Sequence, residues 1–149
     1  MKFKKRIPTL EKPTAKYFIT FVTWERLELT PDARQIVLDA CRFFHGERYE
    51  LFAAVIMPDH VHILIQPYLK TENDYWSISS ILHSIKSYSS KQIPKAMVHI
   101  GKVWQDGRYD EMIRNEDEFQ NKWEYIRQNP VKAGLSKTPE DYPFFWESF

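Results

Sequence analysis

Residues 49–66 read YELFAAVIMPDHVHILIQ, two apolar segments separated by a Pro-Asp pair that favours a turn. This pattern predicts a β-hairpin, with strands over Tyr49–Met57 and His60–Gln66. Side chains alternate between the two faces of a strand, so His60 and His62 are expected to share one face. The apolar residues between and after them then face the other way.

Two imidazoles on one face of a rigid strand can supply two ligands of a metal site. A bare His-x-His pattern also has an ordinary explanation, because two polar residues on a half-buried strand look the same in sequence. The hairpin alone does not separate these interpretations.

The composition predicts one folded domain, since 149 residues with 43% hydrophobic content and only 4 glycines can bury a core. No apolar run reaches the ~20 residues of a membrane span, and the N-terminus lacks the apolar segment of a signal peptide. A single cysteine, Cys41, excludes an internal disulfide, and its place on an apolar helix face predicts a buried thiol. We therefore expect a cytoplasmic protein without membrane contact.

The charge is nearly balanced overall, with 21 Lys and Arg against 20 Asp and Glu, but it is uneven along the chain. The first sixteen residues hold several basic side chains and one acid, Glu11. We therefore divide the chain into a basic arm, residues 1–16, and a single domain, residues 17–149. Such an arm could follow DNA phosphates or be a solvated tail.

The other segments alternate between strand and helix patterns. We expect further strands over 17–24 and 98–105, and helices over 31–44, 78–93 and 115–129, the last one ended by Pro130. Capping residues support two of these helices, Thr30 for the first and Asn115 with Glu118 for the third. The order strand-helix-strand-strand-helix-strand, then a helix, predicts a ferredoxin-like α+β fold with an antiparallel sheet and flanking helices.

The predicted third helix carries a tyrosine away from its apolar stripe. At ~100° per residue, Phe119, Trp123 and Ile126 share one direction, whereas Tyr125 points roughly 120° from Phe119. Tyr125 and Asn129 are i, i+4 neighbours and share a face. On its own this arrangement also describes an ordinary half-exposed surface tyrosine.

Three motifs in order give the chain a resemblance to a known family. MPDHVHIL (57–64) is followed by VWQDGRYDEMIRNEDEF (103–119) and YIRQNPVKAGL (125–135). Over about 17–142 the chain resembles the single-tyrosine transposases of the HUH superfamily, and among them the REP-associated tyrosine transposases. The resemblance implies the HUH endonuclease fold, DNA transposition, and nicking and rejoining of single-stranded DNA at hairpins.

The resemblance also implies residue roles. His60 and His62 match the metal ligands, Asn129 matches the position that completes the metal site, and Tyr125 matches the nucleophile that forms a 5′-phosphotyrosine bond. The expected cofactor is Mg²⁺ or Mn²⁺, with Mn²⁺ at least as effective in vitro because imidazole suits it. Tyr109 is the runner-up nucleophile. A monomer is expected rather than a dimer.

Basic and aromatic residues in three regions are expected to contact DNA. They are Lys4, Lys5 and Arg6 in the arm, Lys86 and Lys91 on the second helix, and Trp104, Arg108 and Arg114 in the middle motif. The roles of Trp104 and Arg114 are either structural or DNA-contacting.

Other functions fit the sequence less well. A zinc hydrolase needs more His, Asp or Glu ligands at set spacing, which His45, His83 and His99 do not supply. A replication initiator needs a helicase domain, for which this chain has no room. The open alternative is a domesticated protein that binds DNA hairpins without transposase activity.

Overall fold

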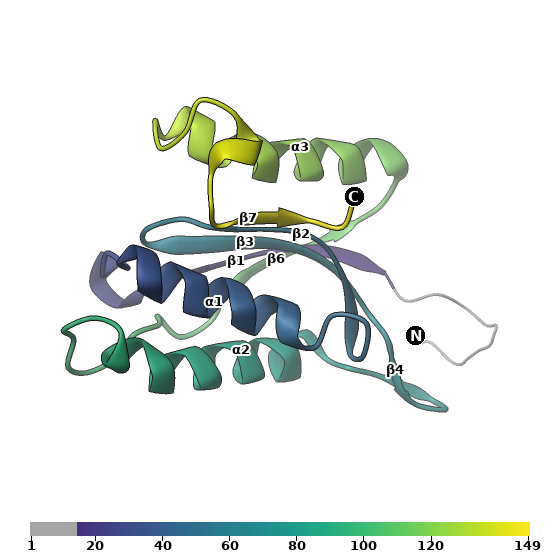
Figure 1. Ribbon diagram of the computed structural model, residues 1–149. Coiled ribbons are helices and arrows are strands. Elements are labelled where there is room, and N and C mark those ends of the chain that lie inside the picture. The colour runs from purple at the N-terminus through teal and green to yellow at the C-terminus, as the bar shows by residue number, and fades with distance from the viewer. Residues whose placement is uncertain (1–14) are drawn as a thin grey trace.

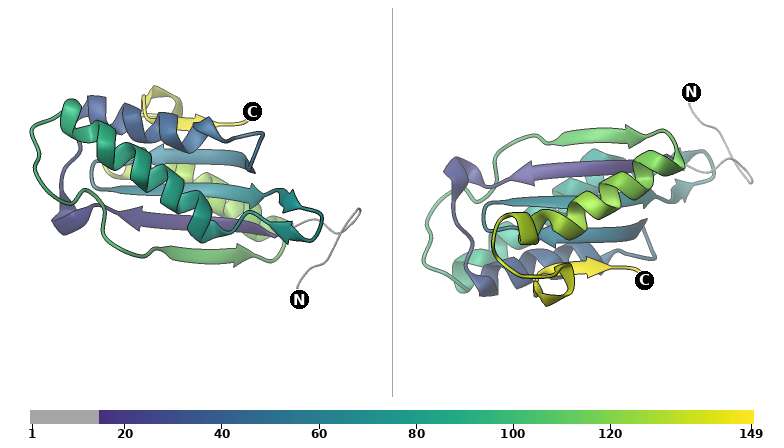
Figure 2. Two further views of the ribbon diagram at one scale, coloured as in Figure 1. Left: turned by 90° about the horizontal axis from the view of Figure 1, so that it is seen from below. Right: turned by 90° about the horizontal axis from the view of Figure 1, so that it is seen from above.

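The computed structural model describes residues 15–149, and its centre is a five-stranded antiparallel sheet (Figure 1). The strands are β1 (Lys16–Val22), β2 (Tyr49–Ile56), β3 (His60–Pro67), β6 (Tyr109–Ile113) and β7 (Phe145–Glu147). Helices α1 (Pro31–Phe43) and α2 (Ile78–Gln92) cover one face, and α3 (Glu116–Lys132) covers the other. Figure 2 shows α3 crossing the sheet on its own, opposite the pair.

The strand order is β6-β1-β3-β2-β7, so β3 lies between β1 and β2 as in a split βαβ unit. The predicted α+β class, the antiparallel sheet and the hairpin are confirmed. Shorter elements complete the chain. They are the hairpin of β4 (Leu69–Thr71) and β5 (Asp74–Tyr75), and the 3₁₀ turns η1 (Trp24–Arg26), η2 (Ile93–Lys95) and η3 (Pro139–Asp141).

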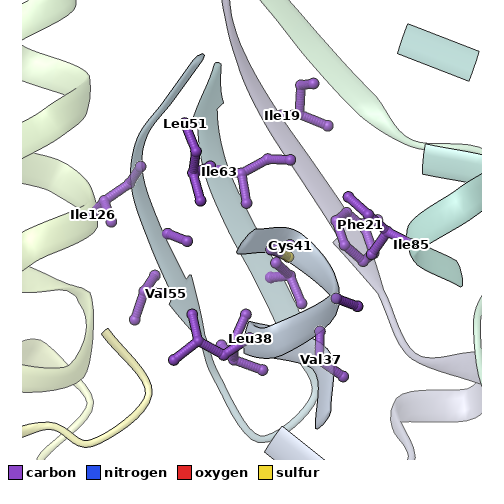
Figure 3. Close-up of a cluster of buried hydrophobic side chains, with 14 of the residues drawn as sticks. Ile19, Phe21, Val37, Leu38, Cys41, Leu51, Val55, Ile63, Ile85 and Ile126 are labelled. Carbon is purple, nitrogen blue, oxygen red and sulfur yellow. The ribbon is translucent and has the colours of Figure 1, made fainter. Parts of the chain in front are cut away.

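Strand β3 is the middle strand of the sheet, and helices cover both of its faces. Val61, Ile63 and Ile65 are fully buried. Across the β1–β3 ladder, Ile63 pairs with Ile19, and both belong to the core under α1 and α2 (Figure 3). Burying one such side chain stabilises the fold by ~1.5–3 kcal/mol. The opposite face of β3, which carries the histidines, lies beneath α3.

The helices begin where the capping residues predict. The Thr30 hydroxyl accepts a hydrogen bond from the Ala33 amide at 3.3 Å, and the Asn115 side chain accepts one from the Glu118 amide at 2.9 Å. The Glu118 carboxylate accepts the amide of Arg114, one residue before the cap, at 2.9 Å. These bonds satisfy amides that a helix N-terminus leaves free.

The predicted strand over 98–105 is wrong. Its segment forms only one isolated bridge, from Trp104 to Thr23, while Val98 and Ile100 are fully exposed. The edge of β1 is instead occupied by β6, in the register Thr20 to Tyr109. A polar edge strand such as YDEMI buries little apolar surface, so its sequence lacks the apolar alternation that marks a strand.

The predicted end of α3 at Pro130 is also wrong, since the helix continues to Lys132. Proline removes only one N–H donor here, in the last turn, and its own carbonyl accepts from the Leu135 amide at 2.9 Å. Gly134, with φ of 76°, then reverses the chain. Asn129 therefore lies inside the same continuous helix as Tyr125.

The expected basic arm lies almost entirely outside the described residues. Lys16, its last member, instead begins β1, with its ammonium 5.0 Å from the centre of the Phe119 ring. Within residues 15–149, the helices are too short or too polar to cross a membrane.

We expect Cys41 to resist thiol reagents while the protein is folded. The thiol is buried between α1 and the sheet (Figure 3), and burial raises its pKa to about 12. The reactive thiolate is therefore scarce at neutral and mildly alkaline pH. Ellman's reagent should detect one thiol per chain in denaturant and almost none in the native protein. Rapid labelling of native protein would contradict this packing.

Candidate active site

The β1–β3 register brings the two histidines beneath α3. His62 pairs with Thr20 and His60 pairs with Val22 across this ladder, and paired residues lie on the same face of a sheet. The two imidazole centroids are 4.9 Å apart. His62 is almost fully buried, at 5% exposure, and His60 is partly exposed. The predicted shared face is confirmed.

Each histidine uses its Nδ1 atom for a neighbour in the protein. Nδ1 of His60 lies 2.8 Å from a carboxylate oxygen of Asp59, and Nδ1 of His62 lies 2.7 Å from the Thr20 hydroxyl. A carboxylate only accepts, so Nδ1 of His60 carries the proton and Nε2 of the neutral ring keeps its lone pair. The Thr20 hydroxyl can accept from or donate to Nδ1 of His62, and metal binding through Nε2 of His62 requires the tautomer in which the hydroxyl accepts. Histidines that bind metals are oriented in this way.

The buried environment keeps His62 neutral. Burial is the largest cause that lowers its pKa to about 3, and the neighbouring His60 and Lys122 contribute to the same shift. Neutral imidazole is the form that coordinates metal ions. The donor set therefore fits a divalent cation without prior loss of a proton from His62.

Tyr125 projects from α3 onto this pair. Its ring centroid is 5.3 Å from that of His62 and 5.8 Å from that of Phe18, and Phe18 itself stacks on His62 at 5.4 Å. The side chain is 45% exposed, whereas the predicted apolar stripe of α3 is buried. Tyr125 is thus in contact with the histidine site and open to solvent on its other side.

Asn129 lies one helical turn beyond Tyr125 and is half-buried. Within residues 15–149, no three His, Cys, Asp or Glu side chains come together in a way that could hold a metal ion. A cation at the histidine pair therefore needs further ligands of another type. The amide oxygen of Asn129 is of the right chemical type.

A strained turn, which the sequence did not reveal, supports Asp59. Glu25 and Arg26 in η1 have φ values of 50° and 56°, which cost ~1–3 kcal/mol per residue without glycine. The guanidinium Nε of Arg26 lies 3.0 Å from the second carboxylate oxygen of Asp59. Thr23, which is fully buried, fixes the turn by donating its amide to the Asp59 carbonyl at 3.0 Å and its hydroxyl to Leu27.

Several residues expected to contact DNA instead contact the protein. Lys86 donates to the carbonyls of Gln105 and Gly107 at 3.0 and 2.8 Å. Trp104 is buried, and its indole N–H donates to Ser89 at 2.9 Å. Lys91 is exposed at the end of α2, on the sheet face opposite Tyr125. Lys4, Lys5 and Arg6 lie outside the described residues.

The remaining candidates lie on or near the edge strand β6. Arg108 pairs with Asp110 at 2.8 Å, and Arg114 pairs with Glu118 at 2.7 Å while staying 76% exposed. Tyr109 is exposed, and its hydroxyl donates to Glu111 at 2.9 Å. This bond and the Glu111 charge raise the pKa of Tyr109, which disfavours its phenolate form.

Comparison with known proteins agrees with this geometry. The sequence pattern of the family described as "Transposase IS200 like" matches residues 12–129, most of the chain and the entire histidine–tyrosine site. The chain belongs to this family. A REP-associated tyrosine transposase of Escherichia coli is 26% identical over 143 residues, which cover 87% of this chain and 78% of that protein.

One further sequence relative and one solved structure resemble this member of the IS200-like family. A Haemophilus influenzae protein, provisionally named a REP-associated tyrosine transposase, is 28% identical over 142 residues, covering 86% of this chain and 77% of that protein. A solved structure of a REP-associated tyrosine transposase bound to a REP hairpin superposes with a TM-score of 0.71. It covers 97% of this chain and 82% of that chain at 24% identity, which establishes the shared fold.

The C-terminal strand of the transposase anchors the helix that carries Tyr125. Glu147 in β7 accepts the indole N–H of Trp123 at 2.8 Å and pairs with the Arg127 guanidinium. Trp123 and Arg127 flank Tyr125 on α3, two residues away on either side. Arg127 also pairs with Glu140 in η3. No sequence pattern marks this anchor, because β7 is a short strand whose partners lie far away in the chain.

We expect Glu147→Gln to destabilise the protein by about 1–3 kcal/mol, because it removes the negative charge and replaces one of two acceptor oxygens with an amide donor at a side chain that is only 20% exposed. Urea unfolding followed by far-UV circular dichroism measures this change. Glu140→Gln is the matched control, because it loses a pair with the same Arg127 at a site that is 62% exposed. Its cost should stay below about 1 kcal/mol. Equal costs for the two variants would contradict the anchoring role of Glu147.

Proposed function

We propose that this transposase cuts and rejoins single-stranded DNA at hairpins, with Tyr125 as the nucleophile. The observation that carries the proposal is the contact of Tyr125 with His62 in a site where both histidines are oriented through Nδ1. Membership in the IS200-like transposase family supports the reaction class. A structural neighbour bound to a REP hairpin supports a hairpin as the DNA partner.

His60, His62 and Asn129 are the residues proposed to hold a divalent cation, either Mg²⁺ or Mn²⁺. When bound, such a cation polarises the scissile phosphate and stabilises the negative charge of the transition state. Asp59 and Thr20 orient the two rings, and the stacked Phe18 closes the inner side of the site. The sheet thus supplies the rigid metal-binding part of the proposed site, and the helix supplies the nucleophile.

The proposed cleavage exchanges one phosphodiester for another. The Tyr125 oxygen forms a bond to phosphorus, the bond from phosphorus to the DNA 3′-oxygen breaks, and the phenol proton leaves for solvent while the 3′-oxygen gains one. The strand on the 3′ side of the break then stays attached through its 5′-phosphate, as a 5′-phosphotyrosine. Because the ester is kept, a DNA 3′-hydroxyl can attack it and rejoin the strand without an external energy source.

We expect Tyr125→Phe to keep hairpin binding and to lose the covalent adduct, since it removes only the attacking oxygen. The experiment incubates labelled single-stranded hairpin DNA with protein and Mn²⁺ and resolves the products on a denaturing gel. Tyr109→Phe is the matched control, because it removes a hydroxyl from an exposed tyrosine on the edge strand.

An adduct that survives in Tyr125→Phe but disappears in Tyr109→Phe would reassign the nucleophile. Hairpin binding by the wild-type protein with no adduct under any condition would instead favour the domesticated binding protein, which uses the same surface without cutting.

We expect His60→Ala and His62→Ala each to reduce adduct formation by more than about 100-fold while the protein stays folded. The other face of β3 packs into the core through apolar side chains, which these substitutions leave intact. His99→Ala is a matched control, because His99 hydrogen-bonds to the Lys102 carbonyl in an exposed loop away from the histidine pair. Full activity of both variants after treatment with a chelator would contradict a metal site here.

A further inference from the structure

The strained turn η1 presents two exposed side chains beside the histidine pair. Trp24 is 40% exposed and the Arg26 side chain is 63% exposed. Neither belongs to the set of residues expected to contact DNA. The turn lies against the β2–β3 hairpin, because the Thr23 amide donates to the carbonyl of Asp59 (Figure 2, purple turn).

Arg26 forms an ion pair with the carboxylate that also orients His60. Its Nε lies 3.0 Å from one carboxylate oxygen of Asp59, and the other oxygen accepts a hydrogen bond from Nδ1 of His60 at 2.8 Å. A guanidinium has five N–H donors, and the Asp59 carboxylate lies beside the Nε end of the Arg26 guanidinium. Within residues 15–149 this guanidinium has no other recorded partner, so its two Nη groups can receive an anion from solution.

Trp24 offers an aromatic surface next to that cation. Its amide is fixed to the Val103 carbonyl at 2.8 Å, and the Lys102 ammonium lies 4.6 Å from the indole centroid. Lys102 is itself paired with Asp106 at 3.1 Å. An exposed indole that lies beside the Lys102 ammonium, and two residues before Arg26 in the chain, combines the features that bind one nucleotide of a single strand, a stacking surface and phosphate contacts.

We propose that Trp24 and Arg26 form a binding subsite for one nucleotide of single-stranded DNA next to the phosphate that Tyr125 attacks. The base stacks on the indole of Trp24, and the phosphate of that nucleotide bonds the Nη groups of Arg26. Asp59 then has two roles, since the same carboxylate orients His60 and holds Arg26. This inference rests on the proposed function and adds the place where the strand outside the hairpin is held.

The test measures binding rather than cutting, in a Tyr125→Phe background that prevents a covalent bond. Fluorescence anisotropy compares two labelled DNAs, a hairpin with single-stranded flanks and the same hairpin without them. Trp24→Ala is expected to weaken binding of the flanked hairpin roughly 5- to 150-fold, the range for loss of one stacked base. Trp24→Phe should recover most of the affinity.

Arg26→Gln should weaken binding of the flanked hairpin and reduce the slope of log K against log salt by about 0.7, the value for one single-strand phosphate. Arg42→Gln is the matched control, because Arg42 is exposed on α1, on the other face of the sheet. It removes the same charge and should leave the flank-dependent part of binding unchanged.

Equal affinities of the Trp24→Ala, Arg26→Gln and parent proteins for the flanked hairpin would overturn the subsite. So would an equal loss for the two DNAs, because Trp24 and Arg26 would then act on the hairpin or on the fold. A wild-type protein that forms no adduct would instead contradict the proposed cutting, and the binding experiment is independent of that result.

Discussion

The pairing of β1 with β3 is the interaction on which the rest of the site depends. In this antiparallel register Thr20 lies beside His62 and Val22 beside His60, while Ile19 and Ile63 pair on the core face. A slip by one residue would turn the histidines into the core under α1 and α2 and expose the isoleucines under α3. Burial of those isoleucines makes such a slip costly, so the apolar core also fixes the position of the histidine pair.

The site has one half that the sheet makes rigid and one half that a helix brings to it. Two hydrogen bonds and a stacked ring orient the histidines on β3. Tyr125 depends on how α3 lies over the sheet, and this in turn depends on Phe119 and Trp123 packing on Phe52 and on the Glu147 bonds. The C-terminal strand, although only three residues long, therefore helps to position the proposed nucleophile.

The local chemistry of the sequence predicted most of what the structure contains. Alternation in the hairpin placed the histidines on one face, and helical periodicity placed Tyr125 off the apolar stripe. The errors arose where tertiary context decides. Residues 98–105 have an apolar pattern but no free strand edge, since β6 occupies it, and Pro130 is tolerated because it stands in the last turn of α3.

The features that the sequence did not reveal are those made by residues far apart in the chain. The Arg26–Asp59 pair, the Thr20–His62 bond and the Glu147 anchor each join separate elements, and no local pattern marks them. Lys86 and Trp104 illustrate the reverse case. Their residue types suit DNA contact, but in the fold their polar groups bond to carbonyls and to Ser89.

The most direct test of the central claim is anomalous diffraction from crystals of the protein soaked in Mn²⁺. We expect one manganese peak at the histidine pair, within ~2–2.4 Å of Nε2 of His60 and of His62, with the Asn129 amide oxygen as a further ligand. A manganese ion bound elsewhere, with no metal at the Nε2 atom of either histidine, would contradict the assignment of this site.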